Sequence, residues 1–178
     1  MNYQFVYFLL FSFFSFNLLG QSIKLKDKES FIIYFDEQDS LDAIEGIWSL
    51  NVINTLYDKH GKVVGQSLDE VLSEWAIMRE DKIRFKVCDI GEPGKNASKF
   101  YAYFEKTSID ELYTYTCKFK NPSWVANANV ILNDGVTLEY EYFVSDLEMK
   151  TISKSQYKED LKLHWRFIWI KKYPASNF

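Results

Sequence analysis

Eight strand-like runs lie between residues 46 and 172, and in several of them apolar and polar side chains alternate. Successive side chains of a β-strand point to opposite faces, so this alternation predicts strands with one buried face. In the run 136–144, for example, aliphatic and tyrosine side chains fall on one face, and threonine and glutamate fall on the other. The eight predicted strands are 46–54, 74–79, 82–90, 98–106, 112–120, 124–132, 136–144 and 163–172.

Most connections between these strands are short. Asn133-Asp134-Gly135 is a strong hairpin signal, because Asp-Gly tolerates the positive φ angles of a type I′ turn. The segments 79–82 and 91–96 are further turns, the first charged and the second rich in Gly and Pro. Two connections are long, 55–72 and 145–162, and the stretch 153–161 within the second fits a helical turn.

Eight strands joined by hairpin-like turns form a meander with two unpaired edges. Closing the sheet removes both edges, and a barrel of eight strands encloses either packed side chains or one small ligand. We therefore predict an all-β fold, an eight-stranded antiparallel up-and-down barrel. A two-sheet β-sandwich is the alternative.

Composition and charge limit the classes of partner. Phe, Trp and Tyr make up 18% of the chain, and tyrosine alone occurs 12 times, which further favours β-structure. The net charge is −4, and the lysine-rich run 24–29 alternates with acids, as a solvated face does. A nucleic-acid-binding protein needs clustered Lys and Arg, so we expect no nucleic-acid partner.

The first 20 residues contain no charged side chain, and a largely apolar run of 15 residues extends from Phe5 to Leu19. A membrane span needs about 20 apolar residues, whereas the core of a secretory signal is shorter. We expect a signal peptide over 1–20, an extension over 21–39 and a barrel domain over 40–178. The mature protein would be secreted or periplasmic and have no integral membrane span. An uncleaved anchor is the alternative.

The start of the first predicted strand carries a motif. Gly46-Ile47-Trp48 opens the strand, and residues 40–45 before it form a short turn in which Ser40 is a suitable N-cap. A short 3₁₀ turn followed by Gly-x-Trp, at the first strand of an eight-stranded meander, resembles the lipocalin/calycin superfamily. The resemblance covers residues 40–174 and is to an outlying member, of the small exported bacterial kind.

The resemblance implies how one end of the barrel is built. The glycine lets the closing turn approach, and Trp48 packs in the barrel floor beneath a basic side chain of the last strand. That side chain is Lys171 or Arg166, and Lys171 is favoured because the end of the last strand lies beside the start of the first. The loop 55–72 stands where lipocalins carry a lid. Residues 21–39 lie outside the resemblance and would add an edge strand or cover one end of the barrel.

The predicted interior is rich in tyrosine, and this suggests a binding site. The inward-facing candidates on strands five to seven are Tyr113, Tyr115, Trp124, Ala126, Ala128, Tyr140 and Tyr142. Tyr101 and Tyr103 are further candidates, because the fourth strand is apolar on both faces and its orientation is undecided. Large tyrosines opposite small alanines fit either a cavity with hydroxyls on its wall or a filled core.

Histidine and cysteine give no sign of a metal site, a cofactor or a disulfide. His60 lies in a turn, and His164 lies on the last strand, where alternation would expose it. Cys88 and Cys117 fall on opposite faces of strands that are not neighbours, so we expect two free thiols.

No catalytic motif accompanies these residues, and we expect no enzymatic activity. The sequence thus predicts an exported barrel that binds a small apolar or amphipathic ligand. The alternative is a secreted, non-catalytic interaction or structural module with a closed core, whose protein partner is unknown.

Overall fold

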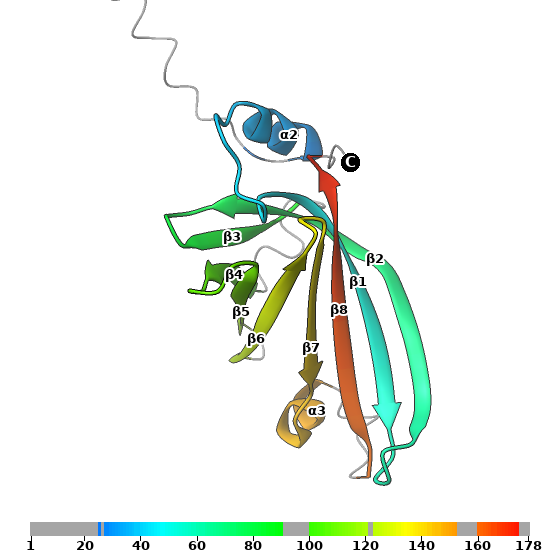
Figure 1. Cartoon of the computed structure of the whole chain (residues 1–178). Coiled ribbons are helices and arrows are strands. Elements are labelled where there is room, and N and C mark those ends of the chain that lie inside the picture. The colour runs from blue at the N-terminus through cyan, green and yellow to red at the C-terminus, as the bar shows by residue number, and fades with distance from the viewer. Residues whose placement is uncertain (1–24, 26, 91–99, 121–122, 153–159, 175–178) are drawn as a thin grey trace, which may run out of the picture.

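The computed structural model describes residues 25, 27–90, 100–120, 123–152 and 160–174. Eight antiparallel strands follow one another around a closed barrel in sequence order, and β8 pairs with β1 (Figure 1). The predicted all-β barrel is confirmed, and the sandwich alternative is wrong. The strands are β1 (Gly46–Tyr57), β2 (Val63–Arg79), β3 (Arg84–Asp89), β4 (Phe100–Lys106), β5 (Leu112–Lys120), β6 (Ser123–Asn133), β7 (Thr137–Phe143) and β8 (Lys162–Tyr173).

The turns follow the local sequence. Asp134 and Gly135 have φ angles of 51° and 68°, the positive values that a type I′ hairpin requires between β6 and β7. Between β2 and β3, the Asp81 carboxylate accepts hydrogen bonds from the backbone N–H groups of Ile83 and Arg84, at 2.9 and 2.8 Å. Before β1, the N–H of Glu45 donates to the carbonyl of Asp42 at 2.9 Å and closes a single turn.

The long connection predicted over 55–72 is wrong. β1 continues to Tyr57 and β2 begins at Val63, so only residues 58–62 connect them. The Asp58 carboxylate accepts from the N–H groups of His60 and Lys62, which closes this tight turn. The segment is a long hairpin rather than a lid loop, because its β-branched and aromatic residues extend the β1–β2 ladder on both sides of the turn.

Of the two roles predicted for the N-terminal extension, the edge strand is wrong, because residues 28–36 form a helix that lies near one end of the barrel (Figure 1). Helix α2 (Lys28–Asp36) begins with a capping box between Asp27 and Ser30. Phe31 and Phe35, one helical turn apart, are buried against the outer face of the barrel. That outer core contains Phe31, Phe35, Ile47, Ala76, Met78 and Ile90. A Lys28–Glu74 ion pair and a hydrogen bond from Tyr173 to Asp36 attach the two ends of α2 to β2 and β8.

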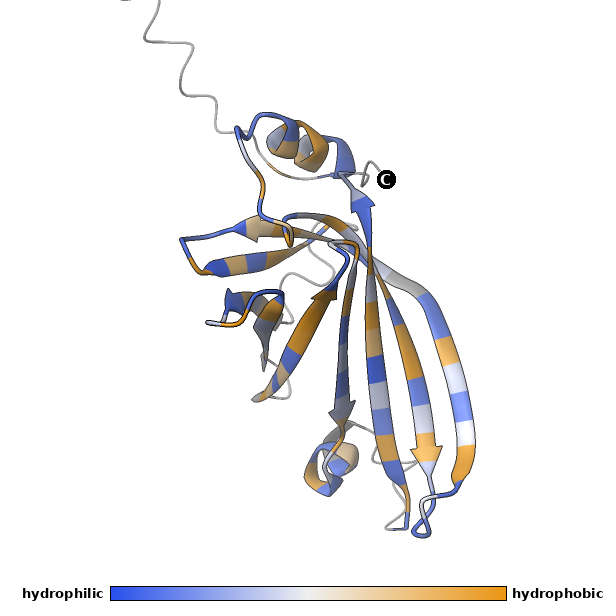
Figure 2. Ribbon diagram, in the orientation of Figure 1, coloured by the Kyte–Doolittle hydropathy of each residue, from blue (hydrophilic) through white to orange (hydrophobic). Residues whose placement is uncertain are grey.

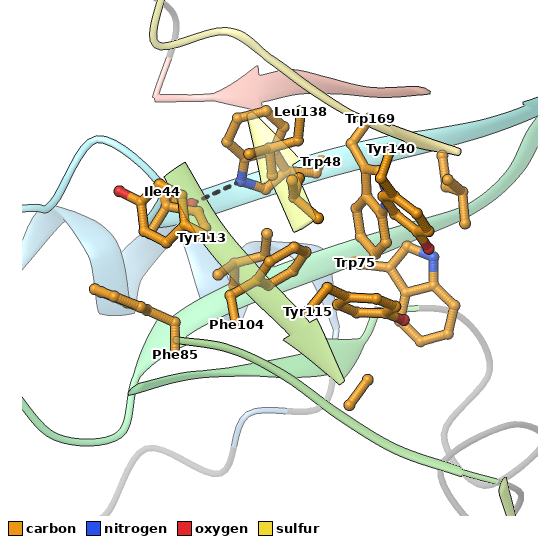
Figure 3. Packing of buried hydrophobic residues seen from close by; sticks show 14 of the residues in the cluster. Ile44, Trp48, Trp75, Phe85, Phe104, Tyr113, Tyr115, Leu138, Tyr140 and Trp169 are labelled. Atoms are coloured by element: carbon orange, nitrogen blue, oxygen red, sulfur yellow. Dashed lines mark hydrogen bonds between the residues drawn. The ribbon is translucent and has the colours of Figure 1, made fainter. Parts of the chain in front are cut away.

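The main core fills the barrel. Alternate residues of each strand enter it. Figure 2 shows apolar and polar bands following one another along the strands. Trp48, Phe85, Phe104 and Trp169 are among its fully buried side chains. Figure 3 shows these aromatic rings packed together with Trp75, Tyr113, Tyr115 and Tyr140.

The two ends of the barrel differ. The end near α2, called here the closed end, holds the turn at 43–44 and the start of β1 (Figure 1). At the opposite end, called here the open end, strand pairing is incomplete within the described residues. The β6–β7 ladder has only the pairs from 131–133 to 137–139, and β3 pairs only with residues 75–79 of β2. β7 is followed there by the short helix α3 (Asp146–Ile152), and the helical turn predicted over 153–161 lies largely outside the described residues.

Candidate ligand-binding site

The closed end is a floor built around Trp48. Lys171 Nζ lies 5.2 Å from the centre of the Trp48 ring and donates to the carbonyl of Ala43 at 2.6 Å. The Trp48 indole N–H donates to the carbonyl of Ile44 at 3.0 Å. A cation over an indole face contributes about 0.5–2 kcal/mol. Arg166, the other basic candidate, instead forms an ion pair with Glu139.

Gly46 is required where β1 meets β8. Its φ angle is +143°, and a Cβ atom at this position would lie 2.1 Å from the carbonyl oxygen of Tyr173. No side chain fits there without moving backbone. The glycine therefore allows β8 to approach β1 and bring Lys171 over Trp48.

Tyr113 belongs to this floor rather than to the group of inner tyrosines. Its hydroxyl donates to the Asp42 carboxylate at 3.2 Å, and Lys106 forms an ion pair with the same carboxylate. Burial, together with the charge of Asp42, raises the pKa of Tyr113. The side chain is thus held in the turn before β1, away from the other candidates.

A column of aromatic rings runs along β7 and β8 from the floor towards the open end. Tyr140 stacks on Phe167 with ring centres 4.5 Å apart and planes at 13°. Trp165 contacts Phe167 edge-on at 6.0 Å and Tyr142 in a stacked arrangement at 6.3 Å. Towards the floor, Trp169 contacts Tyr115 at 6.3 Å. Trp169 and Tyr140 are buried, whereas Phe167, Trp165 and Tyr142 are only partly buried.

Polar atoms gather at the base of this column. The hydroxyls of Tyr115 and Tyr140 lie on the same side of the cluster in Figure 3, and the Cys117 thiol interacts with both. Burial raises the pKa of both tyrosines, and it raises the pKa of Cys117 to about 11. The three groups are therefore neutral at pH 7. The buried Trp169 indole N–H interacts with the Tyr140 hydroxyl.

Small side chains stand opposite these rings. Ala128 pairs with Tyr115 across β5 and β6, and Ala126 pairs with Cys117. Both alanines pack against the inner core and yet keep intermediate exposure. The inner wall is therefore accessible to solvent at this level. Trp124 pairs with Phe119 one position nearer the open end, and its side chain lies outside the described part.

Tyr101 and Tyr103 point outwards, so their proposed contribution to the interior is wrong. Ala102 and Phe104 are the fully buried members of β4, because they pair with inward-facing Cys117 and Tyr115. Tyr103 instead lies beneath the guanidinium of Arg84 on the outer surface, at 4.7 Å.

The rim of the open end is polar. Asn54 donates to the Ser67 hydroxyl at 3.1 Å and to the Asp69 carboxylate at 2.9 Å, on the inner face of the β1–β2 hairpin. On the other side of the rim, the Tyr142 hydroxyl donates to the carboxylate of Glu148 on α3. The candidate site thus has an apolar aromatic wall with polar groups at its base and at its rim.

The histidines and cysteines are not grouped into a metal site within the described residues. His164 is buried on the outer face, which corrects its expected exposure: Phe143 stacks on its ring at 4.3 Å, and Glu141 lies 3.4 Å away. Cys117 faces the interior and Cys88 packs into the outer core beside α2. Within the described residues, no group of three or more His, Cys, Asp and Glu side chains is arranged to hold a metal ion.

Sequence reasoning missed the inner residues of β8: Trp165, Phe167 and Trp169. This strand is apolar on both faces, so its pattern alone does not select the inner one. Lys171 does select it, because a floor contact with Trp48 places residues 169, 167 and 165 on the same face.

Comparison of the chain with family models, with curated proteins and with solved structures gave no match. Neither helix in the described part has the length and hydropathy to cross a membrane. The function therefore has to be inferred from the site itself.

Proposed function

We propose that this protein binds a small amphipathic molecule at the open end of its barrel. One observation carries the proposal: inward-facing aromatic and alanine side chains of β6 and β8 remain partly exposed above buried tyrosine hydroxyls. An apolar wall with a few convergent polar groups is the usual composition of a small-molecule site. A lipocalin-like role in binding and carrying such a molecule fits this arrangement, and no catalytic step is proposed.

The test compares two substitutions on β6. Hydrophobic fluorescent probes should bind and quench tryptophan emission, because Trp165 and Trp169 line the column. Ala128→Leu would fill the space opposite Tyr115 and should abolish quenching while the protein stays folded. Asn127→Leu adds an apolar side chain on the outer face of the same strand and should leave quenching unchanged. Absence of probe binding by the unsubstituted protein would contradict the proposal.

We further propose that the protein acts outside the cytoplasm. The support is the uncharged, largely apolar composition of residues 1–20, which lie outside the described residues. N-terminal sequencing of exported protein should begin near Gln21, and a mature chain that retains Met1 would contradict this.

A non-catalytic interaction module is the second candidate. The observation that favours it is the unpaired side of β2: within the described residues, the stretch 63–73 pairs with β1 alone. An exposed strand edge can accept a strand from a partner protein. Binding of a partner that is lost on substitution within 63–73, with no small ligand in native mass spectra of purified protein, would favour this candidate.

A further inference from the structure

Three basic side chains lie close together on the outer face of β3, β4 and β5, which are neighbouring strands of the barrel (Figure 1). The Arg84 guanidinium carbon lies 4.7 Å from the centre of the Tyr103 ring, and Lys118 Nζ lies 5.6 Å from it. Lys86 is directly opposite Tyr103 in the β3–β4 ladder and therefore shares this face. Arg84, Lys86, Lys118, Tyr101 and Tyr103 are called here the outer basic patch.

The outer basic patch carries more positive charge than its neighbours neutralise. Arg84 donates to the Glu105 carboxylate from Nε at 2.9 Å and from Nη2 at 2.6 Å. Within the described residues, neither Lys86 nor Lys118 forms an ion pair. The segments 91–99 and 119–124, which flank these strands in the sequence, contain one acid and three lysines, so their composition adds net positive charge. This local excess contrasts with the net charge of −4 for the whole chain.

Tyr101 gives the patch an accessible aromatic side chain. It is 41% exposed, and its ring centre lies 5.5 Å from that of Tyr103. Its hydroxyl donates to the Glu80 carboxylate at 3.2 Å, which holds the ring at the edge of the patch. Lys118 is directly opposite Tyr101 in the β4–β5 ladder. An exposed ring beside a lysine suits a ligand that has both an apolar face and a negative group.

Hydrogen-bonding side chains continue from the patch across two further strands. Tyr103 pairs with Thr116 on β5, and Thr116 pairs with Asn127 on β6, so the three share the outer face. The Thr116 hydroxyl donates to Asn127 Oδ1 at 3.0 Å. Asn127 is exposed, and its amide nitrogen is a donor. Because neighbouring strands are about 4.8 Å apart, this row extends about 10 Å from Tyr103, which is about the length of a disaccharide.

This combination favours a sugar polymer over other negatively charged partners. A pyranose ring has a face of C–H groups, which packs against an aromatic ring, and a rim of hydroxyls, which pair with Thr and Asn side chains. At the patch, β3, β4 and β5 are each paired on both sides, so they offer no free edge to an extended peptide. Binding to an anionic membrane relies on inserted apolar side chains or on large basic clusters, and it makes no use of a row of Thr and Asn.

We propose that the outer basic patch binds an acidic polysaccharide, in which a sugar ring packs against Tyr101 and an anionic group faces Lys86 and Lys118. Thr116 and Asn127 form hydrogen bonds with hydroxyls of the adjoining unit. The site is on the outside of the barrel and is separate from the candidate ligand-binding site in its interior.

Matched polymers test the charge of the ligand. Polygalacturonate and dextran sulfate are anionic, and methyl-esterified polygalacturonate and dextran have the same backbones without the charge. Titration calorimetry at low ionic strength should show at least one anionic polymer binding about tenfold or more tightly than its neutral counterpart. Equal affinity within both pairs, or no binding of either anionic polymer, would overturn the proposal.

The recognition of sugar, as distinct from charge, is tested through Tyr101. Tyr101→Leu should weaken binding of the acidic polysaccharide about threefold or more, and it should leave the affinity for polyacrylate, a polyanion without sugar rings, within about twofold. An equal loss for both polymers would overturn the role assigned to the ring. Tighter binding of phosphatidylglycerol vesicles or of a thymidine oligonucleotide than of either acidic polysaccharide would overturn the polysaccharide class.

Single neutralisations locate the site on the molecule. Lys86→Gln and Lys118→Gln should each weaken binding of the acidic polysaccharide about threefold or more. Lys59→Gln makes the same change of net charge at an exposed position in the β1–β2 turn, and the affinity should stay within about twofold. Ala128→Leu alters only the interior of the barrel and should also leave this affinity unchanged. A loss as large in Lys59→Gln or in Ala128→Leu as in the patch variants would overturn the assigned position.

Discussion

The closed and open ends of the barrel are built from the same strands, yet they differ in how deeply their aromatic side chains are buried and in the partners of their polar groups. At the closed end Trp48 is fully buried, and its N–H has a partner. At the open end Trp165 is half-buried, alanines replace large side chains opposite the rings, and carboxylates mark the rim. The closed end is thus fully packed, and the partly exposed inner surface lies at the open end.

Hydrogen-bonding partners show the same division. Glu45, buried in the floor, accepts from Arg79 and from the backbone N–H of Asp42. A buried carboxylate without such partners would cost several kcal/mol. At the other end the buried Trp169 N–H interacts with the neutral Tyr140 hydroxyl rather than with a charged group.

The largest expected difference in the free energy of unfolding is between substitutions of two tryptophans, one at each end of the barrel. Trp48→Ala should lower the free energy of unfolding by about 3–5 kcal/mol, because it removes a fully buried ring and the partner of Lys171. Trp165→Ala, at the open end, should cost about 1–2 kcal/mol, since its ring is only partly buried. Denaturant unfolding followed by far-UV circular dichroism measures both. Equal losses would show that the two ends do not differ in stability.

A smaller difference in the free energy of unfolding is expected between substitutions of two alanines on the inner face. Ala102→Leu should lower the free energy of unfolding by about 1–2 kcal/mol, because Ala102 is fully enclosed and a larger side chain overpacks the core. Ala128→Leu should cost less than about 1 kcal/mol, because its side chain borders the accessible wall. The same unfolding experiment measures both. If Ala128→Leu proves the more damaging, the interior is filled at this level and the binding proposal loses its basis.

Strand number and order could be predicted because each turn and each alternation is local. Asp134-Gly135 specifies its hairpin without reference to the rest of the chain. The floor could be predicted from Gly46, Trp48 and Lys171 through a resemblance, and these residues do meet. The residues at which strands begin and end were harder to predict. The stretch 63–70 is exposed on nearly every side chain, so the burial that normally produces alternation is absent there.

Other features depend on neighbours that a single strand does not reveal. β4 carries aromatic residues on both faces, and only its pairing with Cys117 and Tyr115 decides that Ala102 and Phe104 enter the core. Helix α2 was signalled by the i, i+4 spacing of Phe31 and Phe35 behind a capping pair, but its short apolar run also fits a strand.

The pairing of β1 with β8 bears on the order in which the molecule folds. Every other ladder joins strands that are consecutive in the chain, whereas Ser49 and Ile170, on the closing ladder, are 121 residues apart. Contacts between distant residues are slow to form, because a long loop must be closed before they are made. The Trp48 floor and the attachment of α2 to Tyr173 both wait for this last strand. A growing chain on the ribosome therefore holds Trp48 without Lys171 above its ring until β8 has emerged.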